Sequence, residues 1–394
     1  MSDRYDVAII GGAAMGAATA FWLTRLGAAG RRLALIEADP SFRQASTALS
    51  VASIRQQFTH PINVRTSRYG IDFIRNFAQY VGPDSDPRDL GFIENGYLFL
   101  AGSAAAAEAM RAAQAMQRGE GALTELWSAD EVAARFPHLR TPDVVLASFG
   151  PRDEGWFDNM GLLAGLRGAA RRAGVRFLTG RVTGLERSGS RVVALRIGED
   201  TRIEAGAVVN AAGTQAAHLL SMVDEVIPVE PRKRTVFVID APDVHVPGAP
   251  LMVDHLGFYL RPEGRHWICA TVPETDGPAD PDDFEPDWTQ FETSIWERLY
   301  QRAPGFAAVK VLRAWAGHYA FNRFDQNAIV GRWPGFENLY VMNGFSGHGL
   351  QQAPAMGRGI AELILHGEYR TLDLSELGPE RLGENRPVLE KAIV

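Results

Sequence analysis

The chain has 394 residues, of which 46% are hydrophobic and 22% charged, and its formal net charge is −7. This length favours two lobes over a single core, and the acidic balance argues against nucleic acid as a main partner. The single cysteine, Cys269, excludes an internal disulfide, and the scattered histidines show no metal-ligand spacing, so we predict no metal site.

The first elements predicted along the chain form a βαβ unit. An apolar strand over Tyr5–Ile10 is followed by a helix over Met15–Leu26 and a second strand over Arg32–Asp39. Glu37 stands near the end of that second strand, where dinucleotide-binding folds place the acidic residue that binds a ribose. The unit therefore predicts a dinucleotide site.

The turn between the first strand and the helix matches the dinucleotide fingerprint G-x-G-x-x-G with one change. Gly11 and Gly16 are in place, but Ala13 replaces the middle glycine, which lets the backbone approach a pyrophosphate. Alanine adds a single methyl group, and the helix N-terminus still offers N–H groups and a positive dipole end to phosphates. We therefore expect the site to survive the substitution.

The remaining elements alternate between helices and strands. In chain order we predict a strand over 96–101 and helices over 103–118, 128–137 and 159–173. Antiparallel strands joined by Ser-Gly turns follow over 174–200, and then a buried strand over 207–213. A strand-rich region over 228–323 contains a polar loop (273–286) and a helix (288–302), and the chain continues with a strand over 338–344 and a helix over 350–366.

These elements indicate a mixed α/β (α+β) protein with two domains. Nucleotide-fold signals occur at the start, middle and end of the chain, so the first domain, which is Rossmann-like, is discontinuous. We assign residues 1–90, 145–225 and 325–394 to this dinucleotide-binding domain, and residues 91–144 and 226–324 to an antiparallel-sheet domain for the substrate.

Three further motifs decide which dinucleotide binds. "STALSVASIRQQF" (46–58), "VVNAAG" (208–213) and "GFSGHGLQQAP" (344–354) together resemble the FAD-dependent amino-acid oxidase superfamily, which contains D-amino-acid oxidase, glycine oxidase and monomeric sarcosine oxidase. Longer stretches such as "RDEGWFD" (152–158) and "WAGHYAFNRFDQNAIVG" (315–331) resemble a branch with mitochondrial complex I assembly proteins and bacterial secondary-amine oxidases such as iminodiacetate oxidase. The likeness covers almost the whole chain and implies bound FAD.

The resemblance also implies which residues hold the cofactor. The N-terminal turn would bind the pyrophosphate, the "AAG" strand would lie near the adenosine, and the "GFSGHG" loop would lie over the flavin ring. No cysteine occurs near Trp315, where sarcosine oxidase attaches its flavin, so we predict non-covalent FAD. The residues expected to bind FAD are Gly11, Gly12, Ala13, Met15, Gly16, Glu37, Ala38, Ser46, Thr47, Ser50, Ser53, Val182, Ala211, Ala212, Gly213, Gly344, Ser346, Gly347, His348, Gly349, Leu350 and Gln351.

The candidate substrate residues follow from the same resemblance. Arg55 matches the arginine of sarcosine oxidase that binds the substrate carboxylate, a task that suits the planar guanidinium fork. Tyr259 and Arg261 share one face of a predicted strand, in a region where relatives place a substrate-contacting tyrosine. The ordinary alternatives are a solvated arginine and a sheet aromatic.

Three more residues are candidates for the catalytic site. His266 aligns roughly with the lysine that promotes oxygen reduction in sarcosine oxidase, and His318 could contact the substrate. Gln351 stands where sarcosine oxidase has a carboxylate-binding lysine. The candidates for a second anchor are Arg234, Arg261 and His255, and two cationic anchors would suit a dicarboxylate amine such as iminodiacetate.

We therefore predict an FAD-dependent oxidase of a small secondary amine or N-substituted amino acid, iminodiacetate- or sarcosine-like, that passes electrons to O₂. An amino-acid dehydrogenase that uses a quinone or another carrier and a flavin-binding assembly factor with little turnover remain as alternatives. The expected partners are an amine or amino-acid substrate and an electron acceptor, without nucleic acid or a membrane span. No signal or transit segment is recognisable, which favours a cytoplasmic location.

Overall fold

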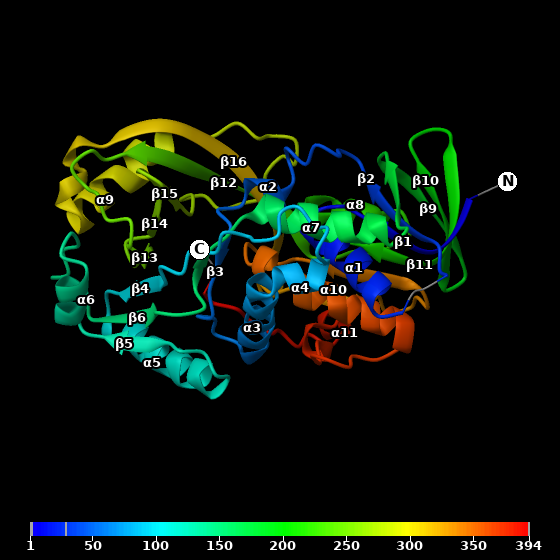
Figure 1. The fold of residues 1–394 in the computed structure, drawn as a ribbon, viewed down its shortest axis with the longest axis horizontal. Coiled ribbons are helices and arrows are strands. Elements are labelled where there is room, and N and C mark those ends of the chain that lie inside the picture. The colour runs from blue at the N-terminus through cyan, green and yellow to red at the C-terminus, as the bar shows by residue number, and fades with distance from the viewer. Residues whose placement is uncertain (1–2, 28–29, 393–394) are drawn as a thin grey trace.

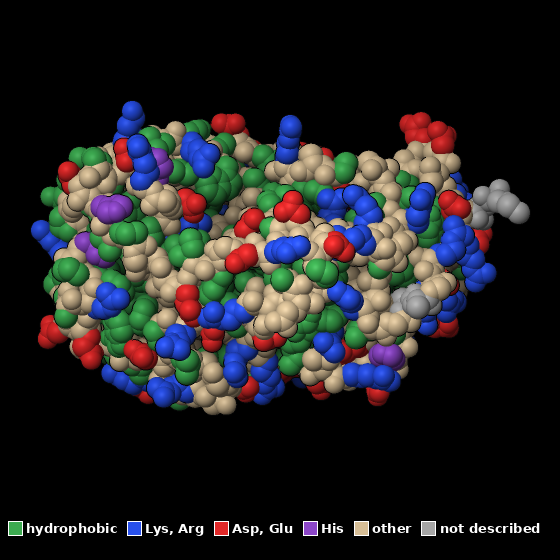
Figure 2. All heavy atoms as spheres, in the orientation of Figure 1, with side chains coloured by type: hydrophobic (Ala, Val, Ile, Leu, Met, Phe, Trp, Pro, Cys, Tyr) green, Lys and Arg blue, Asp and Glu red, His purple; other side chains and the backbone are tan. Residues whose placement is uncertain are grey.

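The computed structural model describes residues 3–27 and 30–392. Two large sheets form two lobes, and helices cover the first sheet on the right of Figure 1 while the second sheet lies on the left. None of the helices in the described part of the chain is both long and apolar enough to cross a membrane. Acidic and basic side chains are interspersed over the face shown in Figure 2.

The first sheet is built around parallel strands. Its members are β1 (Asp3–Ile10), β2 (Leu33–Glu37), β8 (Arg176–Thr179), β9 (Val182–Ser188), β10 (Arg191–Ile197), β11 (Thr201–Asn210), β17 (Ile329–Arg332) and β18 (Leu339–Asn343). The order is β17-β18-β11-β1-β2-β8, with β9 and β10 attached beside β11. β18, β11, β1, β2 and β8 pair in parallel. The Rossmann-like prediction is therefore confirmed.

Small residues let the helices pack closely on one face of this sheet. These helices are α1 (Ala14–Arg25), α3 (Pro61–Arg75), α4 (Phe77–Val81), α7 (Asn159–Arg172) and α10 (Gly349–His366). A Cβ on Gly357 would come within 2.6 Å of Ala18 in α1, and one on Gly70 would lie 2.0 Å from the Gln351 carbonyl oxygen. Glycine at these positions thus sets how near α10 lies to its neighbours.

The second sheet is mainly antiparallel. Its strands are β4 (Tyr97–Ala101), β5 (Glu125–Trp127), β6 (Leu146–Gly150), β12 (Val229–Asp240), β13 (Leu251–Asp254), β14 (Phe258–Glu263), β15 (His266–Thr271) and β16 (Lys310–Asn322). The order is β16-β12-β15-β14-β13-β4-β6-β5, and only the β4–β13 pair described here is parallel. β6 pairs with β4 and β5, although our assignment gave residues 145–150 to the dinucleotide-binding domain. The other domain boundaries stay a prediction.

The remaining elements are short or peripheral. They are α2 (Ser46–Leu49), the paired strands β3 (Ser53–Ile54) and β7 (Gly155–Trp156), α5 (Ala104–Gly119), α6 (Ala129–Arg135), α8 (Ala216–Ser221), α9 (Trp296–Arg302), α11 (Glu380–Gly383), the 3-10 turns 213–215, 304–308 and 375–377, and a π turn over 291–295. The predicted cap of α6 is confirmed, because Ser128 Oγ accepts a hydrogen bond from the Glu131 N–H at 3.2 Å.

Two predictions about secondary structure need correction. Helix α3 was not predicted, because its β-branched residues and Gly70 give it weak intrinsic helix propensity. Packing against α10 stabilises it instead. The 174–200 stretch was predicted as antiparallel strands, but only β9 and β10 pair that way. β8 runs parallel to β2 at the edge of the first sheet.

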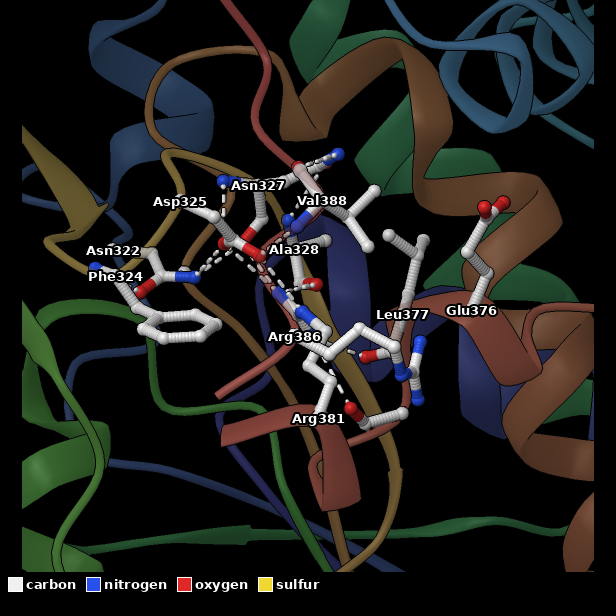
Figure 3. A network of polar contacts seen from close by, with 12 residues as sticks. Asn322, Phe324, Asp325, Asn327, Ala328, Glu376, Leu377, Arg381, Arg386 and Val388 are labelled. Atoms are coloured by element: carbon white, nitrogen blue, oxygen red, sulfur yellow. Dashed lines mark hydrogen bonds and ion pairs between the residues drawn. The ribbon is translucent and has the colours of Figure 1, made fainter. Parts of the chain in front are cut away.

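A buried ion pair ties down the C-terminal segment (Figure 3). Asp325 and Arg381 are fully buried, with Arg381 Nε 2.8 Å from Asp325 Oδ2. The same Asp325 oxygen accepts a hydrogen bond from the Val388 N–H at 2.9 Å. Further along, Glu390 accepts hydrogen bonds from Thr59 and Asn63. The network therefore returns the end of the chain to the middle of the molecule.

Replacing Asp325 by asparagine is expected to lower the free energy of unfolding by about 3 kcal/mol or more, because Arg381 would remain buried without a counter-charge. Urea unfolding measures the loss. Glu384→Gln is the matched control, since Glu384 pairs with Arg386 on the surface, where a pair contributes about 1 kcal/mol or less. Equal stabilities for the two variants would contradict the prediction.

Candidate functional site

A cavity of about 380 Å³ opens between the two sheets. It extends from the glycine turn and Glu37 to Arg55 and Tyr259. The residues predicted to bind FAD that line it are Gly11, Ala13, Met15, Glu37, Ala38, Ser46, Thr47, Ser50, Ser53, Val182, Ala211, Ala212, Gly213, Ser346, Gly347, His348, Gly349, Leu350 and Gln351. Segments more than 300 residues apart in the chain thus meet around one elongated space.

The glycine turn is closely packed between strand β11 and the N-terminus of α1. Gly11 has φ +98°, and a Cβ there would lie 2.3 Å from the Ala211 carbonyl oxygen. A Cβ on Gly16 would lie 1.8 Å from the Gly11 carbonyl oxygen, so Gly16 holds α1 against the turn. Ala13 lines the cavity just before the α1 N-terminus, and its methyl group is the only difference from the glycine of the fingerprint.

Three of the predicted cofactor residues lie behind the cavity wall and not on it: Gly12, Gly16 and Gly344. The Gly12 N–H donates to Glu37 Oε2 at 2.7 Å, which fixes the carboxylate at the end of β2. Gly344 has φ +73° and packs against Asn322 and Val229. These glycines shape the loops that carry the lining residues, and their contact with FAD stays a prediction.

The α2 segment is held in place from three directions. Thr47 Oγ1 accepts a hydrogen bond from the Ala14 N–H at 3.2 Å, at the first turn of α1. Ser46 Oγ donates to the His318 carbonyl oxygen at 2.8 Å, and Trp315 Nε1 donates to the Leu49 carbonyl oxygen at 2.9 Å. The segment therefore links α1 in the first lobe to β16 in the second, along the cavity wall.

Arg55 lies in the cavity wall at the end of this segment. It is 5% exposed, and its guanidinium stands 4.0 Å from the centre of the Phe58 ring. The terminal nitrogens donate to the carbonyl oxygens of Gln57 and Ala392. Within the described residues Arg55 makes no ion pair, so its charge is buried and not neutralised by a carboxylate in contact.

Tyrosines surround the same end of the cavity. Tyr97, Tyr259 and Tyr319 line it, and burial raises the pKa of each of their hydroxyl groups. These side chains therefore remain protonated at neutral pH and present hydrogen-bond donors. Tyr259 lies where the sequence placed it, whereas Tyr97, on β4, was not predicted.

The predicted histidines separate into two groups. His318 lines the cavity, burial lowers its pKa, and its Nε2 atom has no hydrogen-bond partner in the described structure. His348 is also a lining residue, and burial lowers its pKa to about 4, so the imidazole is neutral. His266 does not reach the cavity: its Nδ1 atom is 3.5 Å from Asp240 at the far end of β15. The structure therefore does not bring His266 to the cavity, where its predicted role in oxygen reduction would place it.

The other cationic candidates are engaged elsewhere. Arg261 shares the sheet face of Tyr259, as predicted, but it lies two residues further along β14 and outside the cavity lining. There it donates to the Val51 carbonyl oxygen at 3.1 Å and pairs with Glu263. His255 pairs with Asp143, also outside the lining. Arg234 lines the cavity but is paired with Asp276. Gln351 lines it as expected, and its Oε1 accepts from the Arg55 N–H at 2.7 Å.

Glu154 was missed because only the fold brings it beneath Arg55. The carboxylate is 1% exposed and accepts hydrogen bonds from the Gln56 N–H at 2.7 Å and from Gln57 Nε2 at 2.8 Å. Burial raises the pKa of Glu154 to about 7, against those hydrogen bonds. Glu154 thus holds the backbone of the segment that carries Arg55.

The raised pKa of Glu154 predicts a pH-dependent stability. Because the folded-state pKa lies above the ordinary value of 4.5, this group's contribution is fully present below pH 4.5 and is lost as the pH rises through about 7. The loss amounts to about 3 kcal/mol. Urea unfolding across this range is expected to show a smaller decline for Glu154→Gln, which cannot titrate. Parallel declines in both proteins would contradict the assignment.

The residues around the cavity fit an FAD molecule. Glycine is required by close packing at both ends of the cavity: a Cβ on Gly11 would lie 2.3 Å from the Ala211 carbonyl oxygen, and Cβ atoms on Gly347 and Gly349 would come within 2.6 Å of Tyr319 and 2.8 Å of Met15. Glu37 is fixed near the turn by hydrogen bonds from the Gly12 and Asp39 N–H groups. The cavity therefore offers a phosphate cradle, an acidic ribose ligand and a glycine-rich loop.

Residues 6–363 match the family model for FAD dependent oxidoreductases, and the chain belongs to that family. It is 41% identical to the FAD-dependent oxidoreductase domain-containing protein 1 of Bos taurus, over 95% of this chain and 84% of that one. The protein is accordingly a flavoprotein of the oxidoreductase class, and members of the family bind FAD, usually without a covalent bond.

Solved structures share the fold across nearly the whole chain. L-proline dehydrogenase from P. horikoshii has a TM-score of 0.85 and 25% identity, covering 98% of this chain and all of that one. Iminodiacetate oxidase from Chelativorans has a TM-score of 0.78 and 21% identity, covering 95% and 98%. The second likeness shows the fold alone.

Proposed function

We propose that this protein oxidises the C–N bond of a small secondary amine or N-substituted amino acid that carries a carboxylate. The observation that supports it most is the buried guanidinium of Arg55, which faces the cavity and has no ion-pair partner in the described part of the chain. A buried cation of this kind favours a carboxylate ligand, because the planar fork can donate to both oxygens.

The chain's own residues bind and orient the substrate. Arg55 holds the carboxylate, and the protonated hydroxyl groups of Tyr97 and Tyr259 donate hydrogen bonds nearby. His318 Nε2 has no partner in the described structure and can accept a hydrogen bond from the amine nitrogen. When bound, FAD would supply the two-electron oxidation of the amine to an imine, with O₂ as the electron acceptor that forms H₂O₂. Water then hydrolyses the imine.

A dehydrogenase that passes its electrons to a quinone or another carrier is the second candidate. The likeness to a solved L-proline dehydrogenase favours this type of electron transfer. Proline is a secondary amine with one carboxylate, so this relative also agrees with the proposed substrate class. The two candidates share the substrate site and differ only in the electron acceptor.

Anaerobic mixing with sarcosine, L-proline and iminodiacetate tests the proposal. Bleaching of the visible flavin spectrum by an amine supports C–N oxidation, and a spectrum unchanged by a wide amine panel contradicts it. In air, H₂O₂ formed in step with substrate loss identifies an oxidase. Turnover that requires an added quinone or dye identifies a dehydrogenase.

A further inference from the structure

An acidic loop covers the substrate end of the cavity. We call residues 273–286 the acidic loop, because they include six Asp or Glu residues and no Lys or Arg. Pro281, Asp282 and Phe284 line the cavity, and the Phe284 ring stands edge-on to His318 at 4.6 Å. The loop therefore forms part of the substrate pocket and is not merely a surface connection.

The acidic loop is fastened to β12 through its carboxylates. Lys233 Nζ lies 2.5 Å from Asp283 Oδ2. Arg232 Nη1 lies 3.0 Å from Asp276 Oδ2. The third residue, Arg234, also lines the cavity. Its side chain is buried (6% exposed), and its guanidinium stands 5.0 Å from the centre of the Tyr319 ring.

Asp276 occupies the fork of Arg234 in the way a ligand carboxylate would. Arg234 Nη1 donates to Asp276 Oδ1 at 2.7 Å, and Nη2 donates to Oδ2 at 3.0 Å. The Nε atom is buried without a partner in the described structure. A second carboxylate on the substrate could take the Nη1/Nη2 fork of this arginine only by displacing Asp276, and it would also meet the negative charge of Asp282 in the lining.

We propose that Asp276 is a specificity-determining residue that restricts the pocket to amines with a single carboxylate and excludes dicarboxylates such as iminodiacetate. The proposal rests on the function proposed above, in which Arg55 anchors the single carboxylate. It corrects our expectation of two cationic anchors, since Arg234 is neutralised while Arg261 and His255 lie outside the cavity lining.

Binding of unreactive analogues tests the proposal without turnover. (Methylthio)acetate and thiodiacetate are the thioether counterparts of sarcosine and iminodiacetate, and their dissociation constants are measured from the perturbed visible spectrum of the FAD-loaded protein. The wild type is expected to bind (methylthio)acetate at least about tenfold more tightly. Asp276→Asn should shift the ratio of the two constants toward thiodiacetate by about tenfold or more, the scale of one charge-assisted pair.

Glu274→Gln is the matched control. It removes the same charge from the same loop, but Glu274 is exposed and makes no ion pair in the described structure, so its ratio should equal that of the wild type. A wild type that prefers thiodiacetate, an unchanged ratio in Asp276→Asn, or binding of neither analogue would overturn the proposal. Failure of every amine to reduce the flavin would instead contradict the proposed oxidation while leaving the measured ratio interpretable.

Discussion

Replacing Arg55 by alanine is expected to lower kcat/KM by about a hundredfold to a thousandfold, since removing one partner of a buried charge-assisted pair costs about 2–5 kcal/mol. Arg55→Lys keeps the charge but loses the fork, and about a tenfold loss is expected. Steady-state kinetics with the best amine of the panel measures both. Because Arg55 anchors the carboxylate in both ground and transition states, KM should rise more than kcat falls.

The control for this experiment is Arg261→Lys. Arg261 is equally buried and lies near the same wall, but it is outside the cavity lining. Its substitution should change kcat/KM by less than about threefold. FAD content and the melting temperature must be measured alongside, because Arg55 also donates to the carbonyl oxygens of Gln57 and Ala392. Unchanged kinetics in Arg55→Ala would contradict the anchor role.

Replacing Gly16 by alanine is expected to yield protein that loses most of its FAD. The added Cβ would lie 1.8 Å from the Gly11 carbonyl oxygen, and α1 can avoid that contact only by moving away from the phosphate turn. Overpacking of this kind costs about 1–3 kcal/mol, so the affinity for FAD should fall at least about tenfold. The ratio of flavin to protein absorbance after gel filtration measures the loss.

Two matched variants accompany Gly16→Ala. Gly119→Ala makes the same change at the end of α5, where a Cβ would meet nothing within 4 Å, and it should retain FAD fully. Ala13→Gly restores the middle glycine of the fingerprint, and its affinity should stay within a few-fold of the wild type because one methyl is all that differs. An FAD-loaded Gly16→Ala protein would contradict the geometric argument.

The parts of the site that the sequence predicted are local in the chain. The glycine turn, the 46–55 segment and the 344–351 loop each combine a short motif with its own backbone geometry, and most of their residues line the cavity. Glu37 followed from its position at the end of a strand. The glycine turn and Glu37 could be predicted because neighbouring residues determine their geometry, whereas the 46–55 segment and the 344–351 loop were predicted from the family resemblance of their motifs.

The residues that were missed or misplaced depend on packing between distant segments. Tyr97 and Glu154 meet Arg55 only because β4 and the loop before β7 lie beneath it. Arg261 was misplaced because a shared strand face does not say where along the strand the cavity ends. His266 was placed by a rough alignment with a lysine of sarcosine oxidase, which does not say whether its end of β15 reaches the cavity. The bond between Asp276 and Arg234 joins residues 42 positions apart, and no local pattern indicates it.

The strand order also bears on how the protein is made. β11 has β1 on one side and β18 on the other, and α1 packs on α10. A growing chain that has not yet reached residue 339 leaves the β11 edge open and the apolar side of α1 uncovered, and such surfaces promote aggregation. The 344–349 loop is also absent at that stage. We therefore expect FAD uptake to require the C-terminal segment, and fragments ending before residue 339 to be insoluble when expressed.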